Sequence, residues 1–312
     1  MKIGLLSSQV TDRLNPQITM QQVVEEAVGA ERLGFDSFWI VNSPWGMDAM
    51  TVANVAGQKT ESIELGTSVV PAFPRHPVIM AQQAITTNIA MGGRFTLGIG
   101  VSHKDIMENE YQVGYQQPAR RMSEYLQLVV PLCKGEQVNF KGEFFSANIK
   151  LRPPGFLPVN VLVAAMGPKM LEVTGAHGHG TLPWLVSAER LEDMIVPTIC
   201  NAAKAAGRPA PRVSVILPVV VSDNVPEAKQ KTDALLDTGP KREVYEKLKE
   251  KQGYSTHADV AIIGNKEEIY KQVMHLKAIG ISDFIAAPLR IDDTNYHATC
   301  QVLSEIRHSL PD

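Results

Sequence analysis

Short apolar runs alternate with amphipathic stretches from one end of the chain to the other. Each run is bounded by turn residues and is followed by a segment in which apolar residues recur at helical spacing. This alternation is expected of parallel strands that are each covered by a helix. The eight runs lie at 2–7, 37–42, 63–70, 94–101, 160–166, 181–187, 212–222 and 283–288. Because eight strand–helix units close a barrel, the sequence predicts an α/β fold, a (β/α)8 TIM barrel.

Helical spacing is clearest in residues 20–34, where Gly34 is expected to end the helix. Five apolar residues fall on one face of this helix: Val23, Val24, Ala27, Ala30 and Leu33. Similar patterns occupy 77–91, 118–134, 168–178, 188–206, 226–252, 265–279 and 293–309.

No low-complexity linker divides the chain, so we expect a single domain over residues 1–312. The segment 138–151 departs from the strand–helix repeat. It alternates apolar and polar residues around Lys141 and Gly142, which predicts a β-hairpin inserted between the fourth helix and the fifth strand.

The charge balance argues against several classes of partner. A net charge of −3 and a pI near 6.3 provide no basic field to attract nucleic acid or anionic lipid. The first residues, MKIGLLSS, hold too few apolar side chains for a signal peptide or a membrane helix, so a cytoplasmic protein is expected. The cysteines, Cys133, Cys200 and Cys300, lie far apart, and His177 and His179 lack further ligands nearby, so no metal site is expected.

The active site of such a barrel lies at the C-terminal ends of its strands. After the fifth run, Gly167 and Pro168 begin a helix and Lys169 follows at once. Unpaired N–H groups, the helix dipole and one cation could together hold a phosphate there. Because any strand-to-helix junction can carry Gly-Pro, an ordinary turn is the alternative.

The strand end RFTLGIGVSH, residues 94–103, combines glycines with a titratable group. Gly98 and Gly100 would let a flat ring approach the backbone closely, and His103 follows them. The alternative is a glycine-rich strand end with a surface histidine. In the neighbouring segment 66–77, His76 precedes Pro77 at the start of a helix, which favours a capping role over catalysis.

Four blocks, taken in this order, resemble the luciferase-like monooxygenase superfamily: GFDSFWIVNSPW, IELGTSVVPAFPRHP, GGRFTLGIGVSH and VLVAAMGPKMLEVTGAHGHGTLPWL. The resemblance runs through nearly the whole chain. Its most specific parts, the block around the third and fourth strands and the AAMGPKML junction, resemble the branch that depends on coenzyme F420, a deazaflavin.

The resemblance implies a deazaflavin ring that rests on a bulge at the end of the third strand, formed by a non-proline cis peptide. That bond maps to Ser68–Val69. The loop after the fifth strand is implied to hold the cofactor phosphate. The residues implied to bind the cofactor are Val41, Asn42, Ser68, Val69, Val70, Val101, Ser102, His103, Ala165, Met166, Gly167, Pro168 and Lys169.

The sequence departs from the sugar-phosphate dehydrogenases of this branch at two catalytic positions. Those enzymes carry a histidine after the second strand and a glutamate after the fourth, where this chain has Asn42 and His103. Trp45 matches a tryptophan of the same motif. We therefore expect His103 to donate or accept a proton and Asn42 to offer a neutral hydrogen bond, with Trp45 as the third catalytic candidate.

The function implied is an oxidoreductase that transfers a hydride between coenzyme F420 and a small organic substrate, as a reductase or dehydrogenase. One alternative is an FMN-dependent monooxygenase of the same fold. Another is a non-catalytic deazaflavin-binding protein. The sequence does not identify the substrate, because the loops that set specificity vary independently of the fold.

A homodimer is also expected, because this superfamily pairs barrels through the helices after the second and third strands. In this chain those helices contain small residues that permit close approach: Ala49, Ala53, Ala56, Ala81 and Ala84. The alternative is that these alanines pack on their own barrel.

Overall fold

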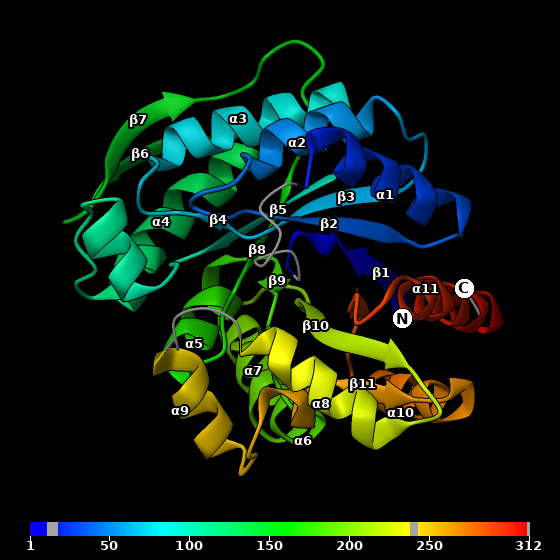
Figure 1. Ribbon diagram of the computed structural model, residues 1–312. Helices are drawn as coiled ribbons and strands as arrows, with labels where there is room; N and C mark the ends of the chain where they lie inside the picture. The colour runs from blue at the N-terminus through cyan, green and yellow to red at the C-terminus, as the bar shows by residue number, and fades with distance from the viewer. Residues whose placement is uncertain (11–17, 238–242, 311–312) are drawn as a thin grey trace.

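The computed structural model describes residues 1–10, 18–237 and 243–310, and these form a closed parallel barrel surrounded by helices (Figure 1). The strands pair in the order β1-β2-β3-β5-β8-β9-β10-β12, and β12 pairs with β1. These strands are β1 (Lys2–Leu6), β2 (Ser37–Val41), β3 (Glu64–Ser68), β5 (Phe95–Gly100), β8 (Asn160–Val163), β9 (Gly180–Thr181), β10 (Arg212–Val221) and β12 (Asp283–Pro288). The predicted (β/α)8 TIM barrel is confirmed.

Helices follow the strands, as the sequence predicts. They are α1 (Met20–Arg32), α2 (Ala49–Gly57), α3 (Pro77–Ala90), α4 (Pro118–Cys133), α5 (Pro168–His177), α6 (Ala188–Arg190), α7 (Val196–Ala205), α8 (Val225–Leu236), α9 (Glu243–Lys251), α10 (Lys266–Ala278) and α11 (Asp293–Ser309). A π-helical turn, Leu191–Ile195, joins α6 to α7. Within the described ranges, no helix is long and apolar enough to cross a lipid bilayer.

Two predicted elements are wrong in extent. The helix expected over 226–252 is two helices, since α8 ends at Leu236 and α9 begins at Glu243. The sequence between them includes Gly239 and Pro240, and proline disfavours a helix interior. Residues 238–242 lie outside the described residues. The strand expected over 181–187 ends at Thr181, and only Trp184 forms a further bridge, to Ile216.

The sequence explains why β9 is short. Pro183 has no N–H to donate to a strand ladder, and Leu185 adopts a left-handed backbone with φ of 56°. A short strand that the alternation did not predict, β11 (Ile262–Gly264), pairs with the end of β10. In the segment where the hairpin is expected, β6 (Gln137–Lys141) pairs antiparallel with β7 (Ser146–Lys150).

Two helix starts illustrate how local sequence fixes the elements. Thr19 and Gln22 form a capping box at the start of α1, and the apolar face of that helix is buried. His76 caps α3, since its Nδ1 accepts the N–H of Val78 at 3.3 Å. The capping role predicted for His76 is confirmed.

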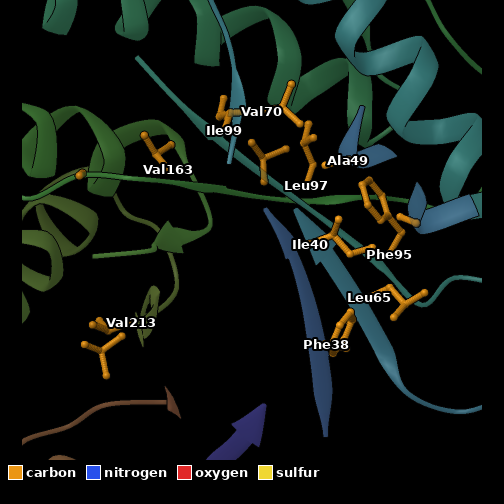
Figure 2. Close-up of a cluster of buried hydrophobic side chains, with 14 of the residues drawn as sticks. Phe38, Ile40, Ala49, Leu65, Val70, Phe95, Leu97, Ile99, Val163 and Val213 are labelled. Atoms are coloured by element: carbon orange, nitrogen blue, oxygen red, sulfur yellow. The ribbon is translucent and has the colours of Figure 1, made fainter. Parts of the chain in front are cut away.

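The larger apolar layer lies between the outer surface of the barrel and the helices. Alternate residues of each strand point outward into it, as the two-residue period of a strand requires. Figure 2 shows part of this layer, with side chains of β2, β3 and β5 beside one residue of α2: Phe38, Ile40, Leu65, Leu97, Ile99 and Ala49.

A second apolar cluster fills the inside of the barrel. Its members come from β2, from four other strands and from the residue that follows β9: Leu6, Trp39, Leu162, Leu182, Ile216, Ile285 and Ala287. Trp39 has no solvent exposure, and its indole N–H donates to Ser37 Oγ at 2.9 Å. The ring has room because Gly66 faces it from β3, where a Cβ would lie 2.4 Å from two ring carbons.

Ion pairs close the N-terminal end of the barrel. Arg212 of β10 binds Asp283 of β12 at 2.6 Å and Glu64 of β3 at 2.8 Å, and Lys2 of β1 binds Glu64 at 3.1 Å. Burial alone would raise the pKa of Glu64, but the charge of Arg212 and hydrogen bonds from Arg212 and Thr96 lower it below its usual value. The carboxylate therefore stays ionised inside this network.

The alanines expected at a dimer interface are all buried within the chain. Ala49, Ala53, Ala56, Ala81 and Ala84 have no solvent exposure, so they pack α2 and α3 onto their own barrel. The argument from small residues is therefore wrong, because the close approach that they permit is used inside the barrel. The same two helices expose larger apolar side chains, Val55 at 38% and Ile79 at 54%.

We predict that Gly66→Ala destabilises the barrel, because the added methyl group would collide with the rigid, fully buried ring of Trp39. Overpacking of this kind costs about 1–3 kcal/mol. Urea unfolding followed by circular dichroism measures the change. The control is Gly29→Ala in α1, where a Cβ meets nothing within 4 Å and a gain of about 0.5–1 kcal/mol is expected. A Gly66→Ala variant as stable as the wild type would contradict the prediction.

Candidate functional site

The C-terminal end of the barrel has an apolar floor. Val41, Val69 and Trp184 are partly buried and pack on top of the apolar cluster inside the barrel. They come from the ends of β2, β3 and the strand that begins as β9. A flat apolar group placed here would cover these three side chains.

The third strand breaks at this floor. The Ser68–Val69 peptide is cis, at the position that the resemblance implies. Beyond the break, β4 (Val70–Pro71) continues the pairing with β5. Thr67 fixes the strand just before the break, because its hydroxyl donates to Gly98 O at 2.8 Å and accepts the Gly98 N–H at 2.9 Å. The break therefore has a defined position against β5.

The two glycines of β5 have a different role from the one expected. A Cβ at Gly98 would lie 1.9 Å from Thr67 O, and one at Gly100 would lie 2.8 Å from Val69 Cγ2 and 3.4 Å from Ala164 Cβ. The space beside them is thus filled by the protein itself, so the glycines do not leave room for a ring. Gly100 instead lets the Val69 bulge and the end of β8 come together.

The junction from β8 to α5 combines a fixed strand end with an open helix start. Ala165 is fully buried, and its N–H donates to Thr181 Oγ1 at 3.3 Å. The Thr181 hydroxyl also lies 3.0 Å from both Val163 O and Ala165 O, so its one proton is shared between these two carbonyl oxygens. In contrast, Gly167 and Lys169 are exposed, and nothing lies within 4 Å of the place of a Gly167 Cβ.

No side chain of the described residues caps the start of α5. Pro168 has no N–H, so the first groups available to an anion are those of Lys169 and Met170. With the lysine cation beside them, these groups could bind a phosphate. The N–H of Ala165 is not available, because Thr181 already accepts it.

His103 lies at the end of β5, directly after Ser102, whose backbone is left-handed with φ of 60°. Tyr115 donates to Ser102 O at 3.2 Å, and His103 O accepts the Met107 N–H at 2.9 Å. The half-buried His103 ring packs edge to face against Tyr245 of α9, with ring centroids 5.5 Å apart. An imidazole therefore stands at the mouth of the barrel in a fixed loop.

Asn42 and Trp45 follow β2 and lie at the start of α2. Asn42 Oδ1 accepts the Ala49 N–H at 3.2 Å, so the amide oxygen is already engaged by the helix. Asp48 caps the same helix and binds Arg75, in the loop after β4, at 2.6 Å. Trp45 is 66% exposed, so its ring stands in solvent.

The described residues contain no group of three or more Cys, His, Asp or Glu side chains that could hold a metal ion. His179 has a structural role instead, since its Nδ1 accepts the Val161 N–H at 3.0 Å. Burial lowers the pKa of His179 to about 4.

The comparisons with known proteins bear on the same segments. A model of the family described as "Luciferase-like monooxygenase" matches residues 1–283. The chain belongs to this family. The match covers every strand of the barrel up to the first residue of β12, and it includes the broken third strand and the α5 junction.

Relatives of this family member include an uncharacterised protein, Rv1360, of Mycobacterium tuberculosis, 29% identical over 223 residues, which are 67% of this chain and 64% of that protein. An F420-dependent glucose-6-phosphate dehydrogenase of Mycolicibacterium fortuitum is 30% identical over 226 residues, 66% of each chain. The aligned part thus spans about two thirds of these relatives.

Among solved structures, an F420-dependent secondary alcohol dehydrogenase in complex with an F420–acetone adduct superposes with a TM-score of 0.80. The superposition covers 100% of this chain and 99% of that one, at 20% identity. It shows that the barrel fold is shared.

Sequence reasoning left three residues out of the site. Trp184 lies within the strand predicted over 181–187, and a Pro–Trp pair there does not reveal that the ring joins the floor. The sequence does not indicate Thr181, because its hydroxyl forms hydrogen bonds with backbone groups at the end of the neighbouring strand, β8. Tyr245 lies in a helix rich in charged residues, EVYEKLKEK, whose pattern is typical of an outer helix.

Proposed function

We propose that the chain is a coenzyme F420-dependent oxidoreductase that transfers a hydride between the deazaflavin and a small organic substrate. The observation that carries the proposal is that an apolar surface and an uncapped helix start both lie near the end of β8. The first suits a flat ring and the second suits a phosphate. Val69 of the apolar floor and Ala164 both lie beside Gly100. The open start of α5, at Gly167, follows Ala164 by three residues in the chain. The kinship to an F420-dependent dehydrogenase supports this choice of cofactor.

The residues present fit such a cofactor. Val41, Val69 and Trp184 offer an apolar surface for a flat ring system, and the N–H groups of Lys169 and Met170 with the Lys169 ammonium suit a phosphate. When bound, a deazaflavin supplies a carbon centre that exchanges hydride and does not readily activate oxygen. An FMN-dependent monooxygenase would use the same two surfaces and is the alternative.

In this proposal His103 moves the proton that accompanies hydride transfer. Reduction of a carbonyl group leaves an alkoxide, and an imidazole within hydrogen-bond reach can protonate it near neutral pH. The loop contacts of Ser102 and His103 orient the ring. Asn42 offers its amide NH2 group to the substrate, because its oxygen is engaged by the start of α2. Trp45 would cover the bound substrate from the same loop.

We also propose a homodimer formed through α2 and α3. The support is that Val55 and Ile79, together with Trp45 beside α2, are three of the four large apolar side chains found exposed among the described residues. Apolar surface of this kind is stabilised by burial against a second copy.

We predict that the protein binds coenzyme F420 more tightly than FMN and that Lys169→Ala weakens F420 binding without unfolding the chain. A charge-assisted contact to phosphate contributes about 1.5–3 kcal/mol, roughly a tenfold to hundredfold change in the dissociation constant. Calorimetric titration with each cofactor measures it, with Lys271→Ala on α10 as the matched control. Tight FMN binding without detectable F420 binding would reject the proposed cofactor.

We predict that His103→Ala lowers turnover far more than it lowers F420 affinity. Loss of a general acid or base costs about 10²–10⁴-fold in rate. Single-turnover oxidation of bound reduced F420, with a panel of enones, quinones and imines, gives the rate constants. The exposed His275 provides the control variant, His275→Ala. Equal rate constants for wild type and His103→Ala would remove His103 from the mechanism, and a wild type that binds F420 but reduces no acceptor would favour a non-catalytic binding protein.

We predict that the wild-type protein sediments as a dimer at micromolar concentration and that a Val55→Lys, Ile79→Lys variant sediments as a monomer. Two charged side chains in an apolar interface would each lose hydration without gaining a partner. Tyr270→Lys, on the exposed face of α10, should leave the dimer intact. A single 34.2 kDa species for the wild type would contradict the dimer.

A further inference from the structure

Helix α9 spans two of the loops that frame the candidate site. Tyr245, near its start, packs against His103 in the loop after β5. Gln252, just beyond its end, binds the loop after β9: its Oε1 accepts the Ser187 N–H at 2.6 Å, and its Nε2 donates to Leu185 O at 3.4 Å. Because that loop also carries Trp184, α9 connects the imidazole to one side chain of the apolar floor.

The Tyr245 ring is held between two imidazoles. It meets His103 at 66° with centroids 5.5 Å apart, and it meets His257 at 87° with centroids 6.5 Å apart. Both are edge-to-face geometries, which aromatic rings favour over stacking face to face. His257 is itself placed by Glu246, with Nε2 3.4 Å from Oε1. The half-buried tyrosine therefore has contacts on both sides that define its orientation.

The loops that α9 joins share an uncommon backbone feature. Ser102, which precedes His103, and Leu185, which follows Trp184, have φ of 60° and 56°. Non-glycine residues rarely occupy this left-handed region, and they persist there when the surrounding structure holds them. Tyr115 holds the first loop through Ser102 O, and Gln252 holds the second through Leu185 O. The first loop is thus fixed by a side chain from later in the same connection between β5 and α4, and the second by a side chain just beyond α9.

We propose that Tyr245 is a positioning residue for His103 and that α9 forms one wall of the reaction site. This inference rests on the proposed role of His103. A proton donor acts only when its ring nitrogen lies within hydrogen-bond reach of the substrate, and a misplacement of about 1 Å can cost about 10²-fold in rate. The edge-to-face contact with Tyr245 restricts rotation of the imidazole toward α9. This restraint comes from the contact between the two rings.

The first experiment observes the placement directly and needs no cofactor. NMR spectra of the free protein labelled with ¹³C-histidine are compared for wild type, Tyr245→Ala, Tyr245→Phe and Tyr270→Ala, the last being an exposed tyrosine of α10 as the matched control. The His103→Ala variant identifies the His103 resonances. We expect the His103 ring signals to shift in Tyr245→Ala, where the neighbouring ring current is lost, and to stay in place in Tyr245→Phe and Tyr270→Ala. The unshifted signal of the remote His179 shows that each variant is folded.

The second experiment measures the consequence for chemistry, by single-turnover oxidation of bound reduced F420 with its fastest acceptor. We expect Tyr245→Ala to lower the rate constant about 10–100-fold while the dissociation constant of F420 stays unchanged, and Tyr245→Phe to restore the rate. Unmoved His103 signals, or an unchanged rate constant in Tyr245→Ala, would overturn the inference. A wild type that binds no F420 would overturn the proposed function alone, because the NMR spectra still report whether the Tyr245 ring contacts His103 in the free protein.

Discussion

The requirement that most constrains this structure is that the inside of a closed barrel must be filled. Trp39 supplies the largest side chain there, and it fits because the facing position on β3 is Gly66. Large and small residues on neighbouring strands thus match one another across the interior. Trp39 and Gly66 lie side by side in the register of β2 and β3. The loops at the C-terminal end start from strands that are held in this register.

The two ends of the barrel differ in how their polar groups are bound. At the N-terminal end, Arg212 joins carboxylates of β3 and β12, and the ion pairs leave the carboxylates fully engaged. At the C-terminal end, β3 breaks at Ser68–Val69 and β9 stops at Thr181, so backbone and side chains there are free to form a surface of their own. The candidate site lies at the end where the regular ladder stops, as active sites generally do in this fold.

The sequence predicted most of the barrel because strand and helix periods differ and because Pro and Gly mark the boundaries. It also placed the β8–α5 junction and His103 at the C-terminal end of the barrel, since both come just after a predicted strand. It failed where tertiary contacts decide. Gly98 and Gly100 accommodate Thr67 and Val69, and no local pattern reveals these contacts. Tyr245 contacts His103 from a helix 142 positions later in the chain.

The pairing of β1 with β12 has a consequence for how the chain folds. Residues 2–5 pair with residues 283–286, and the contact between Arg212 and Glu64 spans 148 positions. One edge of β1 therefore stays unpaired until β12 has been made. Contacts so distant in sequence carry a large entropic cost of loop closure and slow folding. Closure of the barrel therefore requires β12, and a nascent chain that stalls before β12 would expose the edge of β1 to pairing with other chains.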